Sequence, residues 1–487
     1  MQSSPSKSVE SAQYEAILYR TEAFSYVYST DEEIKYITQS GQKTLGFLPS
    51  EPLRLSELFS SRKSAVQLEQ ATQQYMNNVQ VFSAQLIDSQ KSTRDVTLYE
   101  KAISIKRNNE EINGVQGICI FKDESITFEE EMVYIRVIFK SRLSYCLASP
   151  IQMPYIDVKS ASNTIVKIFE EMLQFRKKED LWPTIGRAKF FNGVKFFVER
   201  SLPVEFILPA FPFKSLNTEY KVLGKLPDKG EELAMQTLMG LCLAIERVYA
   251  PGANVNIVSD GTIFSDIDSI PEENVVEYKE KLKKIIPGME KYIQFNDLGC
   301  FFDYCDELMV KREELLRFSG RSFKFIENKI KTNEDTLRMY TAFRRLAEHE
   351  HFQYSAIKES GERSPLKPTN VTGGYIKRFV KEKAKISMVR NEAYSRLIEE
   401  IIPLYVRFTI HLYDNSGPKF SIKLMNLAES DDEIGVADNH IPTPWHNVIV
   451  ETKDGKFVAM RRYEAKKLVD ESHLVYYEPG WPSHYKL

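Results

Sequence analysis

The sequence predicts an α/β protein in which a strand–helix–strand unit is preceded by a smaller region of mixed strands and helices. Two apolar runs, Val204–Leu208 and Val255–Val258, have the length and composition of buried strands, and turn formers follow each of them. The segment between them predicts a helix, because apolar residues recur at helical spacing: Ala234, Leu238, Leu241, Ile245 and Val248. Ligands of open α/β sheets bind beyond the carboxyl ends of the strands, so the turns at 211–215 and 259–266 form the candidate site.

Composition narrows the class of protein. With 487 residues the chain is long enough for two or three domains, and its net charge of -3 argues against nonspecific nucleic-acid binding as its main role. Its 5 cysteines lack CxxC spacing, which predicts neither a disulfide framework nor a zinc knuckle and favours a reducing compartment. We find no signal-peptide pattern and no apolar run long enough to span a membrane, so a cytoplasmic protein is expected.

The N-terminal part resembles a PAS domain. Residues 1–15 are polar and Ser-rich and predict disorder. Residues 16–122 then contain two strand-like runs, short helices and three more strand-like runs, which is the order of elements in a PAS domain; the runs are 24–29, 34–37, 79–87, 95–105 and 114–121. PAS domains can bind haem or flavin, but this region has no His and its one Cys, Cys119, lies within a strand run. A dimerising or packing module with an empty or apolar pocket is the simplest interpretation.

Residues 123–156 predict a linker helix that ends at Ser149-Pro150 to Pro154, and a larger domain is expected from 157 to 487. Within this domain, Ala161–Phe175 predicts a helix and Pro271–Arg317 predicts helical segments. The stretch from 356 to 374, rich in Gly, Pro, Ser and Thr, predicts a long loop and a candidate active-site lid.

Two alternating runs near the C-terminus predict a β-hairpin. Apolar and polar residues alternate in Leu404–Leu412 and again in Phe420–Leu424, with a turn at 414–417 between them. If the polar faces coincide, Arg407, His411, Lys419 and Lys423 converge on a patch suited to phosphate or carboxylate; a solvated face has the same pattern. A second hairpin, Trp445–Glu451 with Lys456–Met460, is predicted by Asp454-Gly455.

Several side chains in these turns are candidates for chemistry. Asp260 and Asp266 flank a glycine turn and can act as general bases or as local caps. Lys214 lies in an aromatic loop, where desolvation would lower its pKa towards a reactive amine or leave it as an anion clamp; an exposed lysine with a packed stem is the alternative. His446 and His411 are acid–base candidates or structural histidines.

Motifs for metals and nucleotides are missing. His349-Glu350-His351 would place its two imidazoles on different faces of a helix, so we reject a zinc site. The sequence also lacks GxGxxG, GxxxxGK[ST] and GxSxG, the usual loops of nucleotide cofactors, P-loops and nucleophile elbows.

Six ordered motifs from about Val158 to the C-terminus resemble the pyoverdine/dityrosine biosynthesis family, whose bacterial members are isocyanide (isonitrile) synthases. They are Arg200-Ser201-Leu202-Pro203, Pro209 to Ser215, Leu226 to Glu232, Ser259-Asp260-Gly261 with Phe264 and Asp266, Arg407 to Lys419, and Thr443-Pro444-Trp445-His446. The resemblance implies a Rossmann-like catalytic domain with a mixed sheet. It also implies a carbon–carbon lyase of secondary-metabolite biosynthesis that converts the amine of an aromatic L-amino acid, L-tyrosine or L-tryptophan, to an isonitrile with ribulose 5-phosphate as carbon donor.

The resemblance assigns roles to the motif residues and implies neither a metal nor a redox cofactor. The expected proton-transfer groups are Asp260, Asp266, His446 and His411, and Lys214 is a further catalytic candidate. The expected substrate-binding residues are Arg200, Phe211, Phe213, Asp228, Glu231, Ser259, Phe264, Arg407, Lys419 and Trp445. Arg407, Lys419, Lys214 and Arg200 are the expected phosphate-binding cations, and Phe211, Phe213 and Phe264 the expected slot for the substrate ring.

Three alternatives stay open. A member of the family can form an N-formyl amino acid, the hydration product of an isonitrile. The chain can instead be a sensor in which the PAS-like region reports a small molecule without turnover, or a generic sugar-phosphate or nucleotide-binding module. PAS-like modules often dimerise, which leaves a homodimer open.

Overall fold

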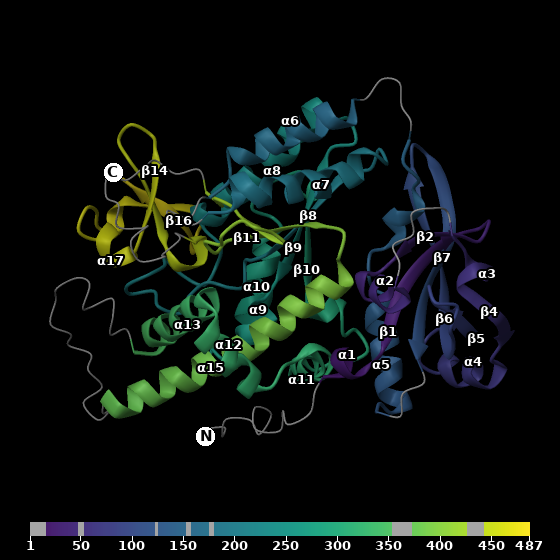
Figure 1. Ribbon diagram of the computed structural model, residues 1–487. Helices are drawn as coiled ribbons and strands as arrows, with labels where there is room; N and C mark the ends of the chain where they lie inside the picture. The colour runs from purple at the N-terminus through teal and green to yellow at the C-terminus, as the bar shows by residue number, and fades with distance from the viewer. Residues whose placement is uncertain are drawn as a thin grey trace.

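The computed structural model describes residues 16–46, 53–121, 125–151, 157–174, 180–352, 373–425 and 443–487. Within these ranges the chain forms a seven-stranded, a five-stranded and a four-stranded sheet in sequence order. The five-stranded sheet lies between the other two, with the N-terminal sheet on the right of Figure 1 and the C-terminal sheet on the left. Most of the predicted lid, 356–374, lies outside the described residues.

The N-terminal sheet confirms the predicted series of strands and short helices. Its strand order is β3-β2-β1-β7-β6-β5-β4, with antiparallel neighbours throughout. The elements are α1 (Ile17–Arg20), β1 (Ala23–Ser29), β2 (Glu33–Ile37), α2 (Gln39–Leu45), β3 (Leu53–Arg54), α3 (Leu55–Leu58), β4 (Phe59–Ser64), α4 (Val66–Gln73), β5 (Val79–Ile87), β6 (Thr93–Arg107) and β7 (Glu110–Phe121). Strands β3 and β4 and helix α4 were not predicted from the sequence.

Side chains fill the interior of this N-terminal part. Phe24, Tyr26 and Phe59 are buried in one apolar cluster between the sheet and the short helices. The hydroxyls of Tyr26 and Tyr28 donate hydrogen bonds of 2.7 and 2.8 Å to the buried carboxylate of Glu100. The hydroxyls of Tyr26 and Tyr28 and the carboxylate of Glu100 thus satisfy one another inside this part of the protein.

The predicted linker helix over 123–156 is wrong in extent and in environment. Helix α5 spans only Phe128–Ile138 and begins with a capping box made by Thr127 and Glu130; the 3-10 turn η1 (Ser144–Leu147) follows. Six of the residues of α5 are buried, because it packs between the N-terminal sheet and the rest of the chain within one continuous core. The helix ends where the chain turns to bring the Arg142 N–H to the carbonyl of Ile401, at 3.0 Å.

The central sheet has the order β10-β9-β8-β11-β12, and every neighbouring pair is parallel. The strands are β8 (Val204–Pro209), β9 (Ala253–Ser259), β10 (Ile293–Asp297), β11 (Val406–Thr409) and β12 (Lys419–Ser421). The predicted strand–helix–strand unit is confirmed, with helix α8 (Lys229–Val248) between β8 and β9. The capping box of Asp228 and Glu231 is confirmed as well.

The predicted hairpin between 404–412 and 420–424 is wrong, because β11 and β12 run parallel and Arg407 lies directly opposite Lys419. The connection leaves the sheet, where the side chain of Asn415 donates to Gln174 and Asp180, at 3.1 and 2.8 Å, and accepts from the Ser421 N–H at 2.7 Å. This anchored loop returns the chain to the same edge, so that β12 enters in the direction of β11. The central sheet, predicted to be mixed, is therefore parallel throughout.

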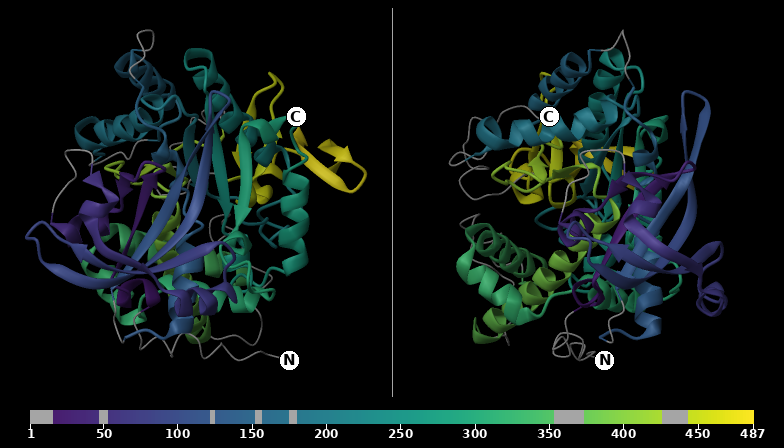
Figure 2. Two further views of the ribbon diagram at one scale, coloured as in Figure 1. Left: turned by 90° about the vertical axis from the view of Figure 1, so that its right-hand side faces the viewer. Right: turned by 45° about the vertical axis from the view of Figure 1, so that its right-hand side comes forward.

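Helices and turns cover both faces of the central sheet (Figures 1 and 2). On one face, the Phe408 ring stacks with Phe206 and with Phe169 of α6 (Val158–Glu170), and Phe206 also stacks with Phe190 of α7 (Arg187–Val198). On the other, Glu205 accepts a 2.9 Å hydrogen bond from Tyr145 of η1. The helical elements of this part are α6 (Val158–Glu170), η2 (Trp182–Gly186), α7 (Arg187–Val198), α9 (Gly261–Phe264), α10 (Glu272–Leu282), η3 (Met289–Lys291), η4 (Leu298–Cys300), α11 (Leu308–Ser319), α12 (Phe323–Thr332), α13 (Glu334–Phe352) and α15 (Gly373–Ile401).

The helical prediction for 271–317 missed strand β10, which is short and lies at the edge of the sheet. The C-terminal hairpin is confirmed: β13 (Val448–Glu451) and β14 (Phe457–Met460) are antiparallel. The remaining elements are η5 (Pro444–His446), α17 (Arg462–Ala465), η6 (Glu471–His473), β15 (Leu474–Glu478) and β16 (Trp481–Lys486). In the described part of the chain, no helix is both long and apolar enough to cross a membrane.

Candidate active site

Three loops meet beyond the carboxyl ends of β8 and β9. The Ser259 hydroxyl donates a 2.9 Å hydrogen bond to the carbonyl of Phe211, and the Phe211 ring packs edge-on against Trp445, 5.3 Å between ring centroids. The Ser215 N–H donates to the Trp445 carbonyl at 3.1 Å. Phe211 holds a φ of 59°, a strained backbone value for an aromatic residue, so the surrounding contacts fix this turn.

Asp260 follows β9 directly and precedes the short helix α9. Its side chain makes no capping hydrogen bond, and among the described residues its buried Oδ1 atom has no hydrogen-bond partner. Burial raises the pKa of this carboxyl to about 6. Gly261 permits this turn, because a Cβ there would lie 2.1 Å from the carbonyl oxygen of Pro212. A carboxylate with a free buried oxygen and a raised pKa is suited to accept a proton.

Asp266, the second predicted base, is held in ion pairs instead. Its two oxygens accept hydrogen bonds from Arg390 of α15 at 2.5 and 2.8 Å, and Arg312 of α11 lies 3.6 Å away. Burial alone would raise its pKa, but the two guanidinium groups hold the pKa of Asp266 below its usual value. Arg312 also donates to the Thr262 carbonyl at 2.7 Å, so these residues brace the 259–268 turn. Asp266 therefore fits a positioning role.

The ammonium of Lys214 is buried, and groups of the protein pair with it. Its ammonium lies 2.7 Å from Asp228 and 2.9 Å from Glu231, and it donates to the Pro444 carbonyl at 2.8 Å. Desolvation lowers its pKa, but the two carboxylates outweigh this, so the pKa of Lys214 is raised. The predicted reactive amine with a lowered pKa is therefore wrong, and Asp228 and Glu231, buried against Lys214, offer no surface to a substrate.

A basic cluster, Arg407, Lys419 and His411, gathers at β11 and β12. Burial and the nearby Arg407 lower the pKa of Lys419 to about 8. His411 keeps contact with solvent, yet the protein crowds its ring, and this desolvation together with Lys419 lowers its pKa to about 4. The convergence predicted from the polar faces is thus seen for these three residues, although the strands are parallel. The lowered pKa favours the neutral imidazole of His411 at neutral pH, near the Lys419 ammonium.

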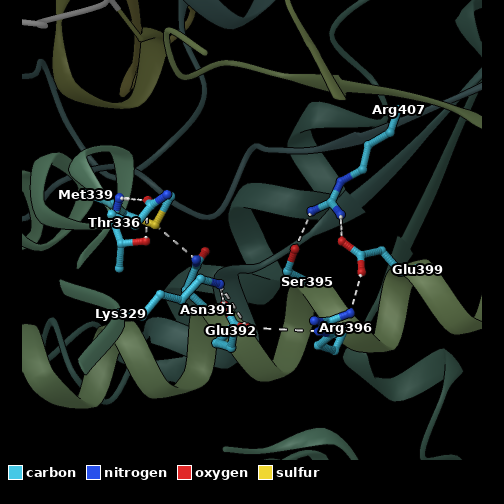
Figure 3. Close-up of polar contacts among 10 residues, drawn as sticks. Lys329, Thr336, Met339, Asn391, Glu392, Ser395, Arg396, Glu399 and Arg407 are labelled. Atoms are coloured by element: carbon cyan, nitrogen blue, oxygen red, sulfur yellow. Dashed lines mark hydrogen bonds and ion pairs between the residues drawn. The ribbon is translucent and has the colours of Figure 1, made fainter. Parts of the chain in front are cut away.

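Figure 3 shows how helix α15 holds Arg407. The guanidinium donates to Ser395 at 3.0 Å and to Glu399 at 3.4 Å, while its Nε is buried without a hydrogen-bond partner among the described residues. Arg396 donates to the other oxygen of Glu399 at 3.2 Å. Arg407 therefore keeps one donor available for an anion.

Tyr394 of α15 links the basic cluster to Asp260. Its hydroxyl donates to the Val258 carbonyl at 2.8 Å. Burial and the Asp260 carboxylate raise the pKa of this phenol, whereas Arg407 lowers it, so both charges lie near the same hydroxyl. Asp260 and Arg407 are thus both near the buried hydroxyl of Tyr394.

Arg200, the fourth predicted cation, lies elsewhere. It precedes β8 and donates to the Phe196 carbonyl at 3.0 Å, with its guanidinium 4.0 Å from the Phe196 ring. The amino end of a parallel strand is opposite to its carboxyl end, so Arg200 is not brought together with the other predicted residues. Phe213 and Phe264 are buried near the three loops, and Phe264 contacts Phe343 of α13 with 6.1 Å between ring centroids.

The structure adds Glu350 of α13, which the sequence analysis considered only as part of a rejected metal motif. Its carboxylate accepts a 2.6 Å hydrogen bond from Ser215, pairs with the buried ammonium of Lys221, and lies 3.7 Å from Nδ1 of His446. His446 belongs to η5 rather than to the start of a strand. In the described part of the chain, no group of three His, Cys, Asp or Glu side chains is arranged to hold a metal.

Asp268, two residues beyond Asp266, is a second addition. Burial and Glu350 raise the pKa of Asp268 to about 7, against the opposite effect of Lys383 and Lys221. The sequence signal for Asp268 was its position after Asp260 and Asp266 in the acidic segment that follows β9, but only those two residues were predicted. With Asp260, this gives the loop two carboxyl groups whose protonation changes near neutral pH.

An open parallel sheet with titratable groups gathered beyond its carboxyl ends is the architecture of an enzyme that handles small molecules. The profile of the pyoverdine/dityrosine biosynthesis protein family matches residues 194–473, and the chain belongs to this family.

The chain is 33% identical over 332 residues to the spore wall maturation protein DIT1 of Saccharomyces cerevisiae, a match covering 59% of this chain and 59% of that protein. It is 30% identical over 348 residues to an L-tyrosine isonitrile synthase of Xenorhabdus nematophila, covering 68% of this chain and 93% of that protein. The crystal structure of PvcA from Pseudomonas aeruginosa superposes with a TM-score of 0.57 at 27% identity, covering 67% of this chain and 99% of PvcA.

Proposed function

We propose that this chain is an isocyanide synthase, which converts the amine of an aromatic L-amino acid, tyrosine or tryptophan, to an isonitrile with ribulose 5-phosphate as carbon donor. Family membership and the relative named L-tyrosine isonitrile synthase support the class of reaction. The observation in the structure that carries the proposal is Asp260, a buried carboxyl with a free oxygen and a pKa raised to about 6.

Asp260 is proposed as the general base. Condensation of the substrate amine with the C2 ketone of the sugar and rearrangement of the adduct both require proton removal. Cleavage of the carbon–carbon bonds that hold C2 in the sugar, C1–C2 and C2–C3, then leaves C2 as the isonitrile carbon, with loss of phosphate. A carboxyl with a pKa of about 6 is ionised at neutral pH and is more basic than an ordinary aspartate. His411, neutral at this pH, is proposed to relay protons or to donate a hydrogen bond.

The basic cluster is proposed to bind the phosphate of the sugar. Arg407 and Lys419 are paired in register on β11 and β12, and through β8 they are level with Asn256 of β9, the strand that Asp260 follows. A guanidinium and an ammonium together suit a phosphate dianion, and the unpartnered Nε of Arg407 supplies a directed donor. Phe211, Trp445 and Phe264 are the proposed wall for the substrate ring.

The domain assignments are also proposals. We assign residues 157–487 to a Rossmann-like synthase domain and 16–122 to a PAS-like packing module, joined through 123–156. The filled interior of the N-terminal part, with its Tyr26–Glu100 hydrogen bond, supports packing rather than ligand binding inside this module.

The test is to incubate purified protein with ribulose 5-phosphate and L-tyrosine, L-tryptophan or L-phenylalanine, and to follow products by mass spectrometry with a tetrazine trap. A trapped adduct that requires both substrates supports the proposal and names the amino acid. An N-formyl amino acid in fresh product, before any acid step, would point to the formamide-forming alternative. Folded protein that gives neither product would refute turnover and favour a sensor or a binding module.

The matched control for this test is Asp260→Asn, which keeps the size of the side chain and removes the base. Folded Asp260→Asn protein with wild-type turnover would remove Asp260 from the mechanism.

A further inference from the structure

A cavity of about 340 Å³ lies beside β9 and β10, next to the segment that follows α5. Its walls come from β9, β10, the end of α15 and that segment: Val258, Asn296, Cys300, Phe301, Ile401, Ile402, Lys140 and Arg142. The volume falls within the range of small-molecule sites. Lys140 and Arg142 lie outside residues 194–473, so the cavity is completed by a part of the chain that the family profile does not cover.

Of the two cations that line the cavity, Arg142 has N–H donors that make no hydrogen bond to another described residue. Arg142 donates from Nη1 to Asn256 at 3.1 Å and to Tyr405 at 3.2 Å, and no hydrogen bond from its Nη2 or Nε to another described residue is present. Lys140, by contrast, is occupied: it lies 2.6 Å from Asp303 and donates to the carbonyls of Cys300 and Phe301, both at 3.1 Å. The charge of Lys140 is therefore compensated, whereas the guanidinium of Arg142 still has a free edge.

The other lining groups define the rest of the ligand. Val258, Phe301, Ile401 and Ile402 give an apolar wall. Asn296 already accepts a weak contact from the Cys300 thiol, at 3.7 Å, through its Oδ1, so its amide NH₂ is the part left to donate. Two side-chain donors beside apolar walls are complementary to a ligand that carries acceptor oxygens and an apolar body.

We propose that this cavity binds a small organic carboxylate, with its carboxylate on Arg142 and Asn296 and its apolar body against Ile401, Ile402 and Phe301. Val258 lines the cavity and directly precedes Ser259 and Asp260, so an occupant rests against the strand that ends at the candidate base. The bidentate geometry of a guanidinium suits a carboxylate, and the neighbouring apolar wall would strengthen that pair. The proposal concerns binding alone and does not depend on the proposed synthase activity.

The test is isothermal titration of the full chain with phenylacetate, 3-phenylpropionate and 4-methylpentanoate at millimolar concentrations, with phenylacetamide as the uncharged match of phenylacetate. We expect saturable binding of at least one carboxylate and at least about tenfold weaker binding of the amide. Arg142→Gln is expected to weaken carboxylate binding by a similar factor. Arg107→Gln, which removes a surface arginine bonded to the Ser149 carbonyl, is the control and is expected to bind as the wild type does.

Ile402→Trp provides a second variant that fills the cavity without touching the charge, and it decides the test if Arg142→Gln fails to fold. Circular dichroism and thermal melting establish folding for each variant. Loss of binding in Ile402→Trp supports the site. No saturable binding of any of the three carboxylates to the wild type would overturn the proposal. Equal binding of acid and amide would also overturn it, as would wild-type affinity in a folded Ile402→Trp or Arg142→Gln protein.

Discussion

The ammonium of Lys214 lies 2.7 Å from the carboxylate of Asp228, and the two side chains are 0% and 1% exposed. Glu231 completes the cluster at 2.9 Å and accepts a further 3.1 Å hydrogen bond from Tyr278. The three charged groups join the loop after β8, the start of α8 and, through the Pro444 carbonyl, the loop that carries Trp445 and His446. A buried ion cluster therefore fixes the loops that surround the candidate site.

Lys214→Met is expected to destabilise the protein strongly. The substitution leaves Asp228 and Glu231 buried side by side without a cation, and breaking a buried pair costs about 3–5 kcal/mol. Urea unfolding followed by circular dichroism measures the change in unfolding free energy. Lys225→Met is the control, because Lys225 and Glu277 form an exposed pair, 50% and 43% accessible, worth at most about 1 kcal/mol. Equal stability of the two variants would contradict the role of Lys214.

Asp260→Asn is expected to stabilise the protein at high pH and not at low pH. The folded protein raises the pKa of Asp260 from 3.8 to about 6, so the folded state holds its proton more tightly than the unfolded state does. Stability contributed by the protonated form is therefore lost as pH rises from about 4 to 6, and the variant avoids that loss, on the order of 2 kcal/mol.

The measurement for Asp260 is the difference in unfolding free energy between wild type and Asp260→Asn at a series of pH values. A difference that does not change between pH values below 4 and above 6 would show that burial does not perturb this carboxyl. If Asp260→Asn is more stable than the wild type and loses turnover, the buried carboxylate of Asp260 lowers stability but serves the reaction.

Local signals in the sequence were sufficient for the β8–α8–β9 unit. Apolar spacing, the Asp228–Glu231 cap and the turn after Val258 each act within a few residues, and each is seen in the structure. The order and direction of β11 and β12 were not predictable in this way, because the alternation in 404–412 and 420–424 is the same for parallel and antiparallel pairing. Only the path of the loop anchored by Asn415 distinguishes them.

Local signals in the sequence also predicted some residues of the candidate site but not others. The sequence pattern places Asp260 just after a buried strand and Arg407 on the polar face of another strand, and both placements are seen in the structure. Glu350 reaches Ser215 and Lys221 from a distant helix, and no local pattern reports such a contact. Arg200 was misplaced because nearness to a strand in sequence does not say which end of the sheet a residue occupies.

Glu350→Gln is expected to lower both stability and turnover. Glu350 is the partner of the buried Lys221, and a neutral amide leaves that ammonium uncompensated, at a cost of about 2–4 kcal/mol. The contact to His446 at 3.7 Å weakens at the same time, so the loop that bears His446 loses its support from α13. Thermal unfolding and initial rates measure the two effects.

Glu348→Gln is the control for Glu350, because it lies on the same helix and makes no described salt bridge. The variant is expected to match the wild type within about 0.5 kcal/mol, as surface substitutions usually do. If Glu350→Gln behaved like Glu348→Gln, the cluster around Lys221 would have no energetic role.

Arg407→Gln is expected to weaken binding of ribulose 5-phosphate by about tenfold or more without changing affinity for the amino acid. The substitution removes a guanidinium that stands opposite Lys419 and keeps a free Nε, and charge-assisted bonds to phosphate contribute about 1.5–3 kcal/mol each. Arg200→Gln is the matched control, since Arg200 precedes β8 and donates to Phe196, away from the carboxyl edge. Isothermal titration with ribulose 5-phosphate, and separately with the amino acid, measures binding without requiring turnover. The assignment of the phosphate to β11 and β12 fails if Arg200→Gln loses sugar-phosphate affinity while folded Arg407→Gln retains it.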